Sequence, residues 1–352
     1  MKKHKNIKTV SSTTELADLL GLSRWTVSRA LNGHAAVSPD TATLIKETAS
    51  QHGFSPNILG RSLRTGKTNL IGVCFPPLLE YALSQKISRL HNAIESCGFH
   101  SVMQMTGGSQ KEENAVLERF ASMRYAGIFL FASHLESDCS GMRSLAASQI
   151  PIVLIDPVIE AVDHPVVITD RSYGVATALK HFHSLGHRRV VAMGFRETGS
   201  YAPQRMLGIK RGCKALGWSV EENIHFLNDD RRQDDFEMGT RLAKKYLAIP
   251  GKRISAILTI NGRIALAAMQ VLHDHGIEAP RDVSIISNGN ADYLSYYRPA
   301  LTTIDYHEEK LMDSALQLLP LTNKKLNEVD RIVVRPRLIV RESTGKPPKG
   351  SF

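Results

Sequence analysis

The spacing of hydrophobic residues changes near residue 70. Before that point, from residue 12 to 53, apolar residues recur at helical spacing in three short runs that Gly and Ser interrupt. After it, short continuous apolar runs alternate with stretches long enough for amphipathic helices. The pattern predicts a small all-α segment followed by a larger α/β body.

The small segment carries helix start and stop signals. Ser12 and Glu15 form a capping-box pattern, and Gly21 can take the left-handed turn conformation after the first helix. Ser23 is placed to cap a second helix that runs to about Asn32. Two short helices joined by a glycine turn are typical of a helix-turn-helix motif.

A third helix is predicted from Pro39, which suits the first helical position, to just before Gly53. Leu44 and Ile45 are expected on the core face of this helix. Val27 of the second helix is expected to point into the same core. The three helices are therefore predicted to share one small hydrophobic core.

The outward face of the second helix carries the candidate chemistry of this segment. Helical periodicity puts Arg24, Trp25, Ser28 and Arg29 on that face. An exposed tryptophan beside two arginines is unfavourable in water unless something covers it. A three-helix domain with an ordinary solvated face is the alternative.

The apolar runs of the body predict parallel sheets. They are continuous rather than alternating, as in strands that helices cover on both faces. They fall into two consecutive cycles, the second beginning at residue 166, which predicts two lobes with a ligand cleft between them. The predicted strands are residues 70–75, 101–105, 127–132, 150–156, 166–169, 189–194, 255–260 and 283–287.

Charge is distributed unevenly between the two parts. Lys and Arg exceed Asp and Glu by 44 to 34, which gives the chain a formal charge of +10. Residues 1–69 hold ten of the basic residues and only four acidic ones. A basic segment joined to a nearly neutral body favours a nucleic-acid partner for the segment.

The remaining composition limits the class of protein. The four cysteines have neither zinc nor redox spacing, so a reducing compartment is expected. No apolar run approaches about 18 residues, so we expect a cytoplasmic protein with no membrane partner. Neither a catalytic motif, a metal-ligand spacing nor a glycine-rich cofactor loop is evident, so we expect no enzyme activity, metal or cofactor.

Nine short sequence strings, taken in their order along the chain, together resemble the strings of one known family. The first four, LADLLGLSRWTVSRALNG, VSPDT, GFSPN and GRSL, cover the helix-turn-helix segment and the residues after it. The other five are residues 186–189, 205–208, 280–284, 299–304 and 336–343. Together they resemble the lactose/galactose-repressor (LacI-type) family of bacterial transcription regulators, from about residue 12 to 343.

The resemblance implies a fold and a division into domains. The implied fold is an N-terminal all-α helix-turn-helix headpiece plus hinge, followed by an α/β two-lobed periplasmic-binding-protein-like (type I) core with parallel sheets. The implied partners are double-stranded operator DNA, a small-molecule effector and a second copy of the chain, with a tetramer left open. The predicted domains are a headpiece at 1–56, a hinge at 57–69, a core for effector binding and dimerisation at 70–345, and a flexible tail at 346–352.

The resemblance also implies DNA contacts, because in that family the second helix lies in the major groove. By position, Arg24, Trp25 and Arg29 would face base edges, where arginine can bind guanine through two hydrogen bonds. Other side chains would hold phosphates, which position a protein without reading sequence. The predicted phosphate contacts are Ser23, Thr26 and Ser28.

The family's hinge folds into a short helix on operator DNA and inserts a leucine into the minor groove. Leu63 has that position here, and Asn57, Arg61 and Arg64 would contact the DNA beside it. Gly60 stands where the family usually has alanine, which weakens such a helix by about 0.5–1 kcal/mol. A plain linker is the alternative for this segment.

Family members usually bind an effector through polar residues in the cleft. Two acidic positions are lost here, at Gly262 and Gly289, and Arg171 replaces a usual asparagine. Because arginine binds carboxylate and phosphate groups, we hypothesise an anionic effector such as a sugar acid or sugar phosphate. The alternative is that Arg171 faces solvent and the cleft binds a neutral sugar or nothing. The other predicted effector residues are Asp156, Asp170, Arg205, Asn261 and Asn290.

These features predict a sequence-specific transcription regulator, a repressor, that binds a pseudo-palindromic operator as a dimer. An effector that closes the cleft would change operator affinity only through its different affinities for the two states. A solute-binding receptor without DNA function is the competing class. Such receptors are normally exported, and no apolar signal core follows the basic start of this chain.

Overall fold

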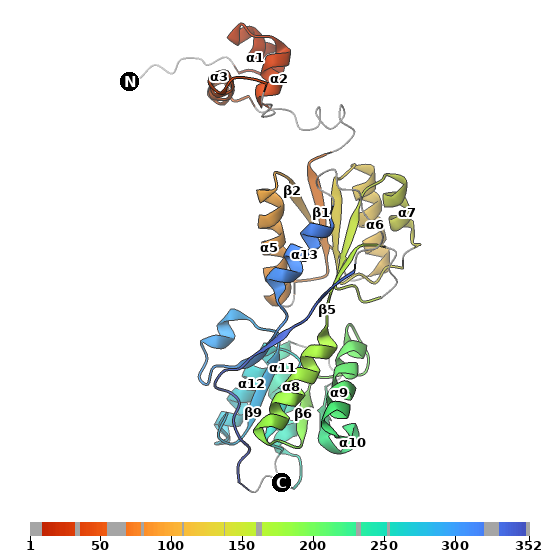
Figure 1. Cartoon of the computed structure of the whole chain (residues 1–352), viewed down its shortest axis with the longest axis vertical. Coiled ribbons are helices and arrows are strands. Elements are labelled where there is room, and N and C mark those ends of the chain that lie inside the picture. Colours follow the sequence, from red (N-terminus) through yellow and green to blue (C-terminus); the bar gives the residue numbers. More distant parts are fainter. Residues whose placement is uncertain are drawn as a thin grey trace, which may run out of the picture. The chain divides into compact units, whose positions relative to one another are not determined.

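The computed structural model divides into two compact units, Met1–Thr68 and Asn69–Phe352 (Figure 1). The predicted hinge contacts Asn57, Arg61, Leu63 and Arg64 lie outside the described residues, as does the predicted helix end at Asn32. The structure describes residues 9–31, 36–54, 68–78, 81–107, 109–136, 138–159, 164–229, 234–251, 254–319 and 331–349.

The described residues of the first unit form three helices, α1 (Thr13–Leu20), α2 (Arg24–Leu31) and α3 (Pro39–Gln51). The Ser12 hydroxyl caps α1 by accepting a hydrogen bond from the Glu15 amide at 3.1 Å. The Glu15 carboxylate in turn accepts from the Ser11 amide at 2.8 Å. Gly21 ends α1 with φ +65°, as the turn requires.

The core of this unit corrects one prediction. Ile45 is fully buried with Val27, as expected, but Leu44 is 52% exposed. Ile45 and Ala49 lie four residues apart and share one helix face, whereas Leu44 is turned about 100° from Ile45. The buried cluster comprises Val10, Leu16, Ala17, Val27, Ala30, Ile45, Ala49 and Phe54.

The second unit begins with a six-stranded parallel sheet, the first lobe, in the order β11-β5-β4-β3-β1-β2. Helices α5 (Tyr81–Ser96) and α13 (Glu308–Leu318) cover one face, and α6 (Gln110–Ser122) and α7 (Ser140–Ala147) cover the other (Figure 1). The strands are β1 (Leu70–Phe75), β2 (His100–Met105), β3 (Gly127–Phe131), β4 (Ile152–Ile155), β5 (Val166–Thr169) and β11 (Arg331–Val334).

The second lobe has its own six-stranded sheet, in the order β12-β10-β9-β8-β6-β7, with only β12 antiparallel to its neighbour. Helices α8 (Arg171–Leu185) and α9 (Ala202–Leu216) cover one face, and α11 (Asp235–Leu247) and α12 (Gly262–Asp274) cover the other. The short elements are α10 (Val220–Asn223) and η1 (Asp292–Ser295). The strands are β6 (Val190–Met193), β7 (Ile224–Leu227), β8 (Ala256–Thr259), β9 (Ser284–Asn288), β10 (Thr302–Asp305) and β12 (Arg337–Ile339).

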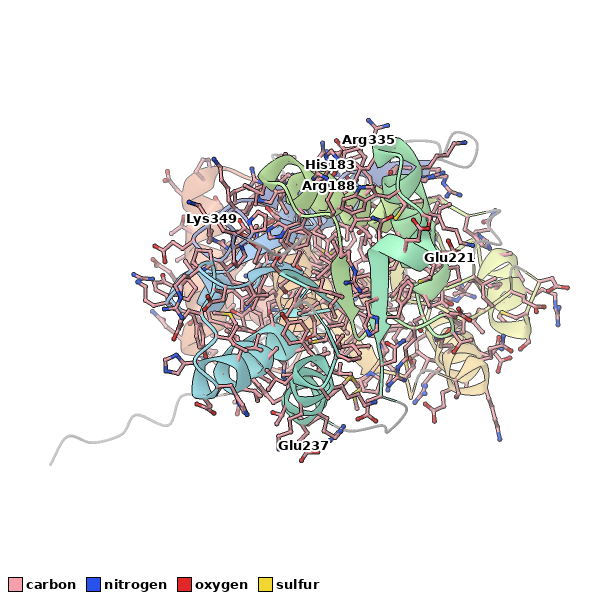
Figure 2. The ribbon with its side chains drawn as sticks, turned by 90° about the horizontal axis from the view of Figure 1, so that it is seen from below. His183, Arg188, Glu221, Glu237, Arg335 and Lys349 are labelled. Atoms are coloured by element: carbon pink, nitrogen blue, oxygen red, sulfur yellow. The ribbon has the colours of Figure 1, made fainter. Side chains whose placement is uncertain are left out.

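The second lobe has two helical layers, one on each face of its sheet. Glu221 on α10 and Glu237 on α11 lie on different sides of the sheet (Figure 2). Gly208 of α9 lies so close to α8 that an added Cβ would be 2.7 Å from the Ser172 carbonyl oxygen. This close approach fixes how α8 packs on α9, and so where both helices begin at the cleft.

The prediction of two consecutive cycles is wrong. Strand β5 was expected to open the second lobe, but it pairs with β4 in the first sheet, with Leu154 opposite Val166. Among the described elements the chain crosses between lobes three times, between β5 and α8, between β10 and α13, and between β11 and β12. An apolar run predicts a strand but not which sheet it joins, because the choice of neighbour depends on long-range contacts.

Candidate functional site

Helix α2 presents the candidate DNA-contacting face. Trp25 is 60% exposed, and the guanidinium carbon of Arg29 lies 3.6 Å from the centre of its ring. Arg24 is exposed on the same helix, while Val27 and Ala30 are buried beneath it. The predicted Arg-Trp surface is therefore present, and Arg29 covers part of the tryptophan ring through a cation–π contact.

The start of α2 gives its hydroxyl side chains a structural role. The Ser23 hydroxyl accepts from the Thr26 amide at 3.0 Å, so it caps the helix. The Ser23 and Thr26 hydroxyl oxygens are also 2.8 Å apart and share a hydrogen bond. Both hydroxyls lie at the helix N-terminus, where the partial positive charge of the helix favours an anion such as phosphate.

A cavity of about 820 Å³ lies within the second unit. Residues from both lobes line it, with α5 and Glu308 from the first lobe and the loops before α9, α11 and α12 from the second. Of the predicted effector residues, Arg171, Arg205, Asn261 and Asn290 contribute to the lining. Asp156 and Asp170 are not among the described residues that line it.

Asp170 instead caps a helix. Its carboxylate accepts from the Tyr173 amide at 2.9 Å and from the Ser172 hydroxyl at 2.9 Å at the start of α8. The side-chain oxygen of Asn290 bonds to the protein rather than facing the cleft freely. It accepts hydrogen bonds from the Thr303 hydroxyl and from Arg341, both at 2.8 Å. Asp170 therefore serves α8, and Asn290 lines the cleft with a side-chain oxygen that protein donors already occupy.

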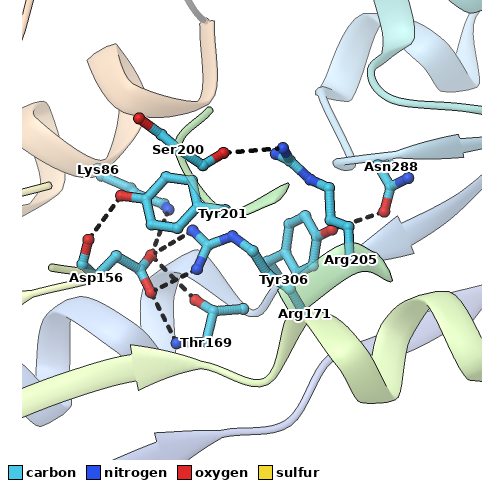
Figure 3. Close-up of polar contacts among 9 residues, drawn as sticks. All are labelled: Lys86, Asp156, Thr169, Arg171, Ser200, Tyr201, Arg205, Asn288 and Tyr306. Carbon is cyan, nitrogen blue, oxygen red and sulfur yellow. Dashed lines mark hydrogen bonds and ion pairs between the residues drawn. The ribbon is translucent and has the colours of Figure 1, made fainter. Parts of the chain in front are cut away.

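Asp156 and Arg171, of which Arg171 lines the cleft, form a buried ion pair (Figure 3). Two guanidinium nitrogens of Arg171 donate to the two carboxylate oxygens at 3.0 and 2.9 Å. The amide and hydroxyl of Thr169 donate to the same carboxylate at 2.8 and 3.1 Å, and the Lys86 ammonium is 3.5 Å away. Every strong partner of this carboxylate is thus a donor or a cation.

The charges around Asp156 decide its protonation. Burial opposes ionisation, but the cations of Arg171 and Lys86 and the donated hydrogen bonds outweigh it, so the pKa of Asp156 lies well below its ordinary value. Arg171 is only 7% exposed, so the alternative that it faces solvent is wrong. Because Asp156 already matches its charge, an anionic effector would compete with that carboxylate for Arg171.

Tyr201 connects this pair to the second lobe. It precedes α9 with φ +62°, and its hydroxyl donates to the backbone oxygen of Asp156 at 2.6 Å. Its ring lies 3.7 Å from the guanidinium carbon of Arg171 and 5.9 Å from that of Arg205 (Figure 3). The arginine plane is therefore stacked on an aromatic ring while its edge binds the carboxylate.

The cleft has carboxylates, but they come from a different element than the sequence comparison with the family predicted. A Cβ at Gly262 would lie 2.7 Å from a methyl carbon of Leu294, so no larger side chain fits there without movement. Asp234 and Asp235 at the start of α11 line the cleft instead. Asp235 accepts from the Asn261 side-chain amide at 3.1 Å. The sequence carries no local signal that this loop reaches the cleft.

The described lining has both signs of charge. Glu308 lies beside Lys86, and burial raises the pKa of its carboxyl above the ordinary value although Lys86 lowers it. Arg263 pairs with Asp234, and Arg205 donates to the Ser200 carbonyl oxygen at 3.4 Å. A ligand here meets carboxylates, amides and guanidiniums together, which suits hydroxyl-bearing molecules.

Two absences hold for the part of the chain that the structure describes. It contains no group of three or more His, Cys, Asp or Glu side chains arranged to hold a metal ion. No described helix is both long and apolar enough to cross a membrane.

Comparisons with known proteins agree with this architecture. Residues 13–57 match the family model described as bacterial regulatory proteins, lacI family, and residues 179–344 match the periplasmic binding protein-like domain. The HTH-type transcriptional repressor PurR of Vibrio vulnificus (strain CMCP6) is 26% identical over 342 residues. This alignment covers 96% of the present chain and 99% of the relative.

Two solved structures share the fold. The lac repressor dimer bound to operator and the anti-inducer ONPF has a TM-score of 0.78 at 21% identity, covering 96% of this chain and 100% of that one. The transcriptional regulator CelR in complex with cellobiose has a TM-score of 0.65 at 22% identity, covering 94% and 99%. The fold and both family matches define a bacterial regulatory protein with a helix-turn-helix segment and a periplasmic-binding-protein-like body. The chain thus carries a lacI-family helix-turn-helix domain and a periplasmic-binding-protein-like domain, as the sequence strings predicted.

Proposed function

We propose that this protein is a transcriptional repressor that binds a pseudo-palindromic operator in double-stranded DNA as a homodimer and responds to a small-molecule effector in its cleft. The observation that carries the proposal is the exposed face of α2. A capped helix in a helix-turn-helix unit presents Trp25 stacked on Arg29, with Arg24 beside them. Such a face suits the major groove, where arginine reads guanine and an aromatic ring packs on a thymine methyl.

The roles of the remaining DNA contacts follow from chemistry. Ser23 and Thr26 bind phosphate at the N-terminus of α2, and Ser28 binds phosphate from the middle of the helix, so together they fix its register on the duplex. The hinge positions Asn57, Arg61, Leu63 and Arg64 stay predictions from the sequence. In that prediction Leu63 is the minor-groove wedge and the two arginines bind the backbone beside it.

Dimerisation is supported by the edge of the first sheet. Strand β2 ends that sheet, and its Met103 and Met105 are 41% and 56% exposed. An edge strand with two exposed methionines gains stability when a second copy covers it. A two-fold dimer then matches the two half-sites of a pseudo-palindrome.

The effector we propose is a sugar or sugar derivative. Asp235 and Asn261 form a carboxylate–amide pair that lines the cleft, and such pairs bind adjacent hydroxyl groups through complementary hydrogen bonds. Arg205, which also lines the cleft, is the group that would bind an acidic substituent. CelR, whose structure contains cellobiose, has a likeness to this chain over nearly its whole length.

The first experiment selects bound DNA from a random pool and compares the selected site with random DNA as salt is raised. A repressor of this kind retains a preference for one pseudo-palindrome, whereas purely electrostatic binding shows equal affinity for all sequences. The second is calorimetry with neutral and acidic sugars on the wild type and on Arg205→Ala. Tight binding of a neutral sugar that Arg205→Ala leaves unchanged would contradict an acidic effector.

A further inference from the structure

The contacts of Asp156 join the two lobes beside the cleft residue Arg171. Asp156 follows β4 of the first sheet, whereas Tyr201 belongs to the loop before α9 in the second lobe. The Tyr201 hydroxyl reaches the Asp156 backbone oxygen at 2.6 Å, and Arg171 lies between the carboxylate and the tyrosine ring (Figure 3). A single guanidinium thus contacts a first-lobe acid along its edge and a second-lobe ring on its face.

The buried environment makes this contact hard to open. Asp156 and Arg171 are 4% and 7% exposed, so separating them would leave the Arg171 charge out of water without its carboxylate. Asp156 would exchange two direct hydrogen bonds for the more distant Lys86 ammonium at 3.5 Å. The Tyr306 ring, on the chain crossing that leads to α13, lies 5.9 Å from the same guanidinium. Because Arg171 and Tyr201 both belong to the second lobe, opening the lobes would separate Arg171 from the Asp156 carboxylate and the Tyr201 hydroxyl from the Asp156 backbone oxygen.

Effectors of two-lobed proteins act by making different contacts in the open and closed states. Here Arg171, at the start of α8 in the second lobe, already makes such a contact with Asp156 of the first lobe. We propose that Arg171 is a resident cation that holds the lobes closed in the absence of an effector. The regulatory consequence rests on the proposed function, because the closed lobes then give a DNA-binding form that requires no ligand.

The proposal is tested by the distance between two labels in the full-length, ligand-free protein. One label is attached to Cys97, which is exposed at the end of α5, and the other to a cysteine introduced as Glu221→Cys on α10 (Figure 2). Cys139 is replaced by serine to prevent a third label. Labelled protein is diluted with unlabelled protein, so that only distances within one chain are measured.

The variant Arg171→Ala removes the guanidinium and leaves a space of its shape facing Asp156. We expect the wild type to give one narrow distance, and the variant to give a longer or broader distribution. Methylguanidinium, added at millimolar concentration, should restore the narrow distance in Arg171→Ala and leave the wild type unchanged. An unchanged distance in Arg171→Ala, or a broadened one that methylguanidinium does not restore, overturns the proposal.

Two further variants keep the test interpretable. Arg281→Ala removes an exposed arginine that pairs with Asp282 at 2.7 Å in the second lobe, and it should keep the wild-type distance. Tyr201→Phe removes only the hydroxyl that reaches Asp156, and it should broaden the distribution to a smaller extent. If Arg171→Ala does not fold, an unchanged distance in Tyr201→Phe overturns the proposal.

Operator binding separates this proposal from the proposed function. Wild-type protein without effector should bind its selected DNA site, and Arg171→Ala should bind it about tenfold more weakly, within the usual range of coupling between sites. Methylguanidinium should restore most of that loss. If no variant binds DNA specifically while the labels still report closure by Arg171, the proposed function fails and the inference about the lobes stands.

Discussion

The guanidinium carbon of Arg29 lies 3.6 Å from the centre of the Trp25 ring, one helical turn away on the exposed face of α2. The ring holds the guanidinium in place from one side, so its donors are oriented before DNA arrives. An oriented arginine loses less side-chain entropy on binding than a free one. Two residues that looked like separate contacts in the sequence therefore form one surface.

The first prediction concerns this surface. Arg29→Ala should weaken operator binding by about 1–3 kcal/mol and relax the base preference at one position of each half-site. Binding to single-base variants of the selected site, measured at several salt concentrations, checks this. Lys46→Ala, an exposed change on α3, is the control and should not alter base preference. An equal loss on all sequences for Arg29→Ala would mean that Arg29 contacts only phosphate.

The second prediction concerns the dimer. Met105→Asp puts a charge on the edge strand β2 in each copy, so it should weaken the dimer about tenfold or more by removing apolar burial and adding repulsion. Sedimentation over a concentration series measures this change. Met123 is similarly exposed at the end of α6, and Met123→Asp should leave the dimer intact. If Met105→Asp and Met123→Asp sediment alike at every concentration, the dimer interface does not include β2.

The third prediction concerns the packing of α8 on α9. A Cβ added at Gly208 would lie 2.7 Å from both the Ser172 carbonyl oxygen and the Val175 Cβ. Gly208→Ala should therefore lower the free energy of unfolding by about 1–3 kcal/mol, because backbone atoms of α8 must move. Urea denaturation checks it. Lys210→Ala, exposed on the same helix, should leave stability nearly unchanged, and an equally stable Gly208→Ala would show that the helices can separate freely.

The fourth prediction uses pH. Glu113 is 2% exposed, and burial raises the pKa of its carboxyl although hydrogen bonds from the Ser133 hydroxyl and the His134 amide oppose the shift. Because the folded pKa exceeds the unfolded one, the wild type loses stability as pH rises from the unfolded pKa through the folded pKa. Glu113→Gln should be at least as stable at neutral pH and should lack this decline, since both bonds go to one oxygen.

Urea denaturation from about pH 4, near an ordinary glutamate pKa, up to about pH 7 measures this loss of stability. Glu118→Gln, which is exposed on the same helix, should retain the wild-type pH profile. The same decline in Glu113→Gln as in the wild type would assign the pH dependence to another group.

Local chemistry made the headpiece and most strands predictable. A cap such as Ser12, a left-handed turn at Gly21 and a periodic apolar face act within a few residues, so their signals are visible in the chain itself. The same holds for β1 and β5, whose bounds match the predicted runs at 70–75 and 166–169. For the body, the sequence strings shared with the family supported the prediction of a two-lobed fold.

The effector site was less predictable, because its contacts join distant segments. Arg205 and Asn261 line the cleft as expected, but Asp170 caps α8 and Asp156 lies beneath Arg171. Nothing near Arg171 in the sequence shows that its partner lies fifteen residues earlier, just after strand β4. The charge of Arg171 suggested an anionic ligand only while that partner was unknown.

Residue patterns alone predicted the helix-turn-helix segment, its Arg-Trp surface, the α/β class of the body and the family resemblance. They did not show that β5 joins the first sheet, that Asp234 and Asp235 line the cleft, or that Arg171 pairs with Asp156. The difference lies in the range of the interactions. Caps, turns and periodicity are energies between near neighbours in the chain, whereas sheet membership and buried ion pairs depend on which distant residues the fold brings together.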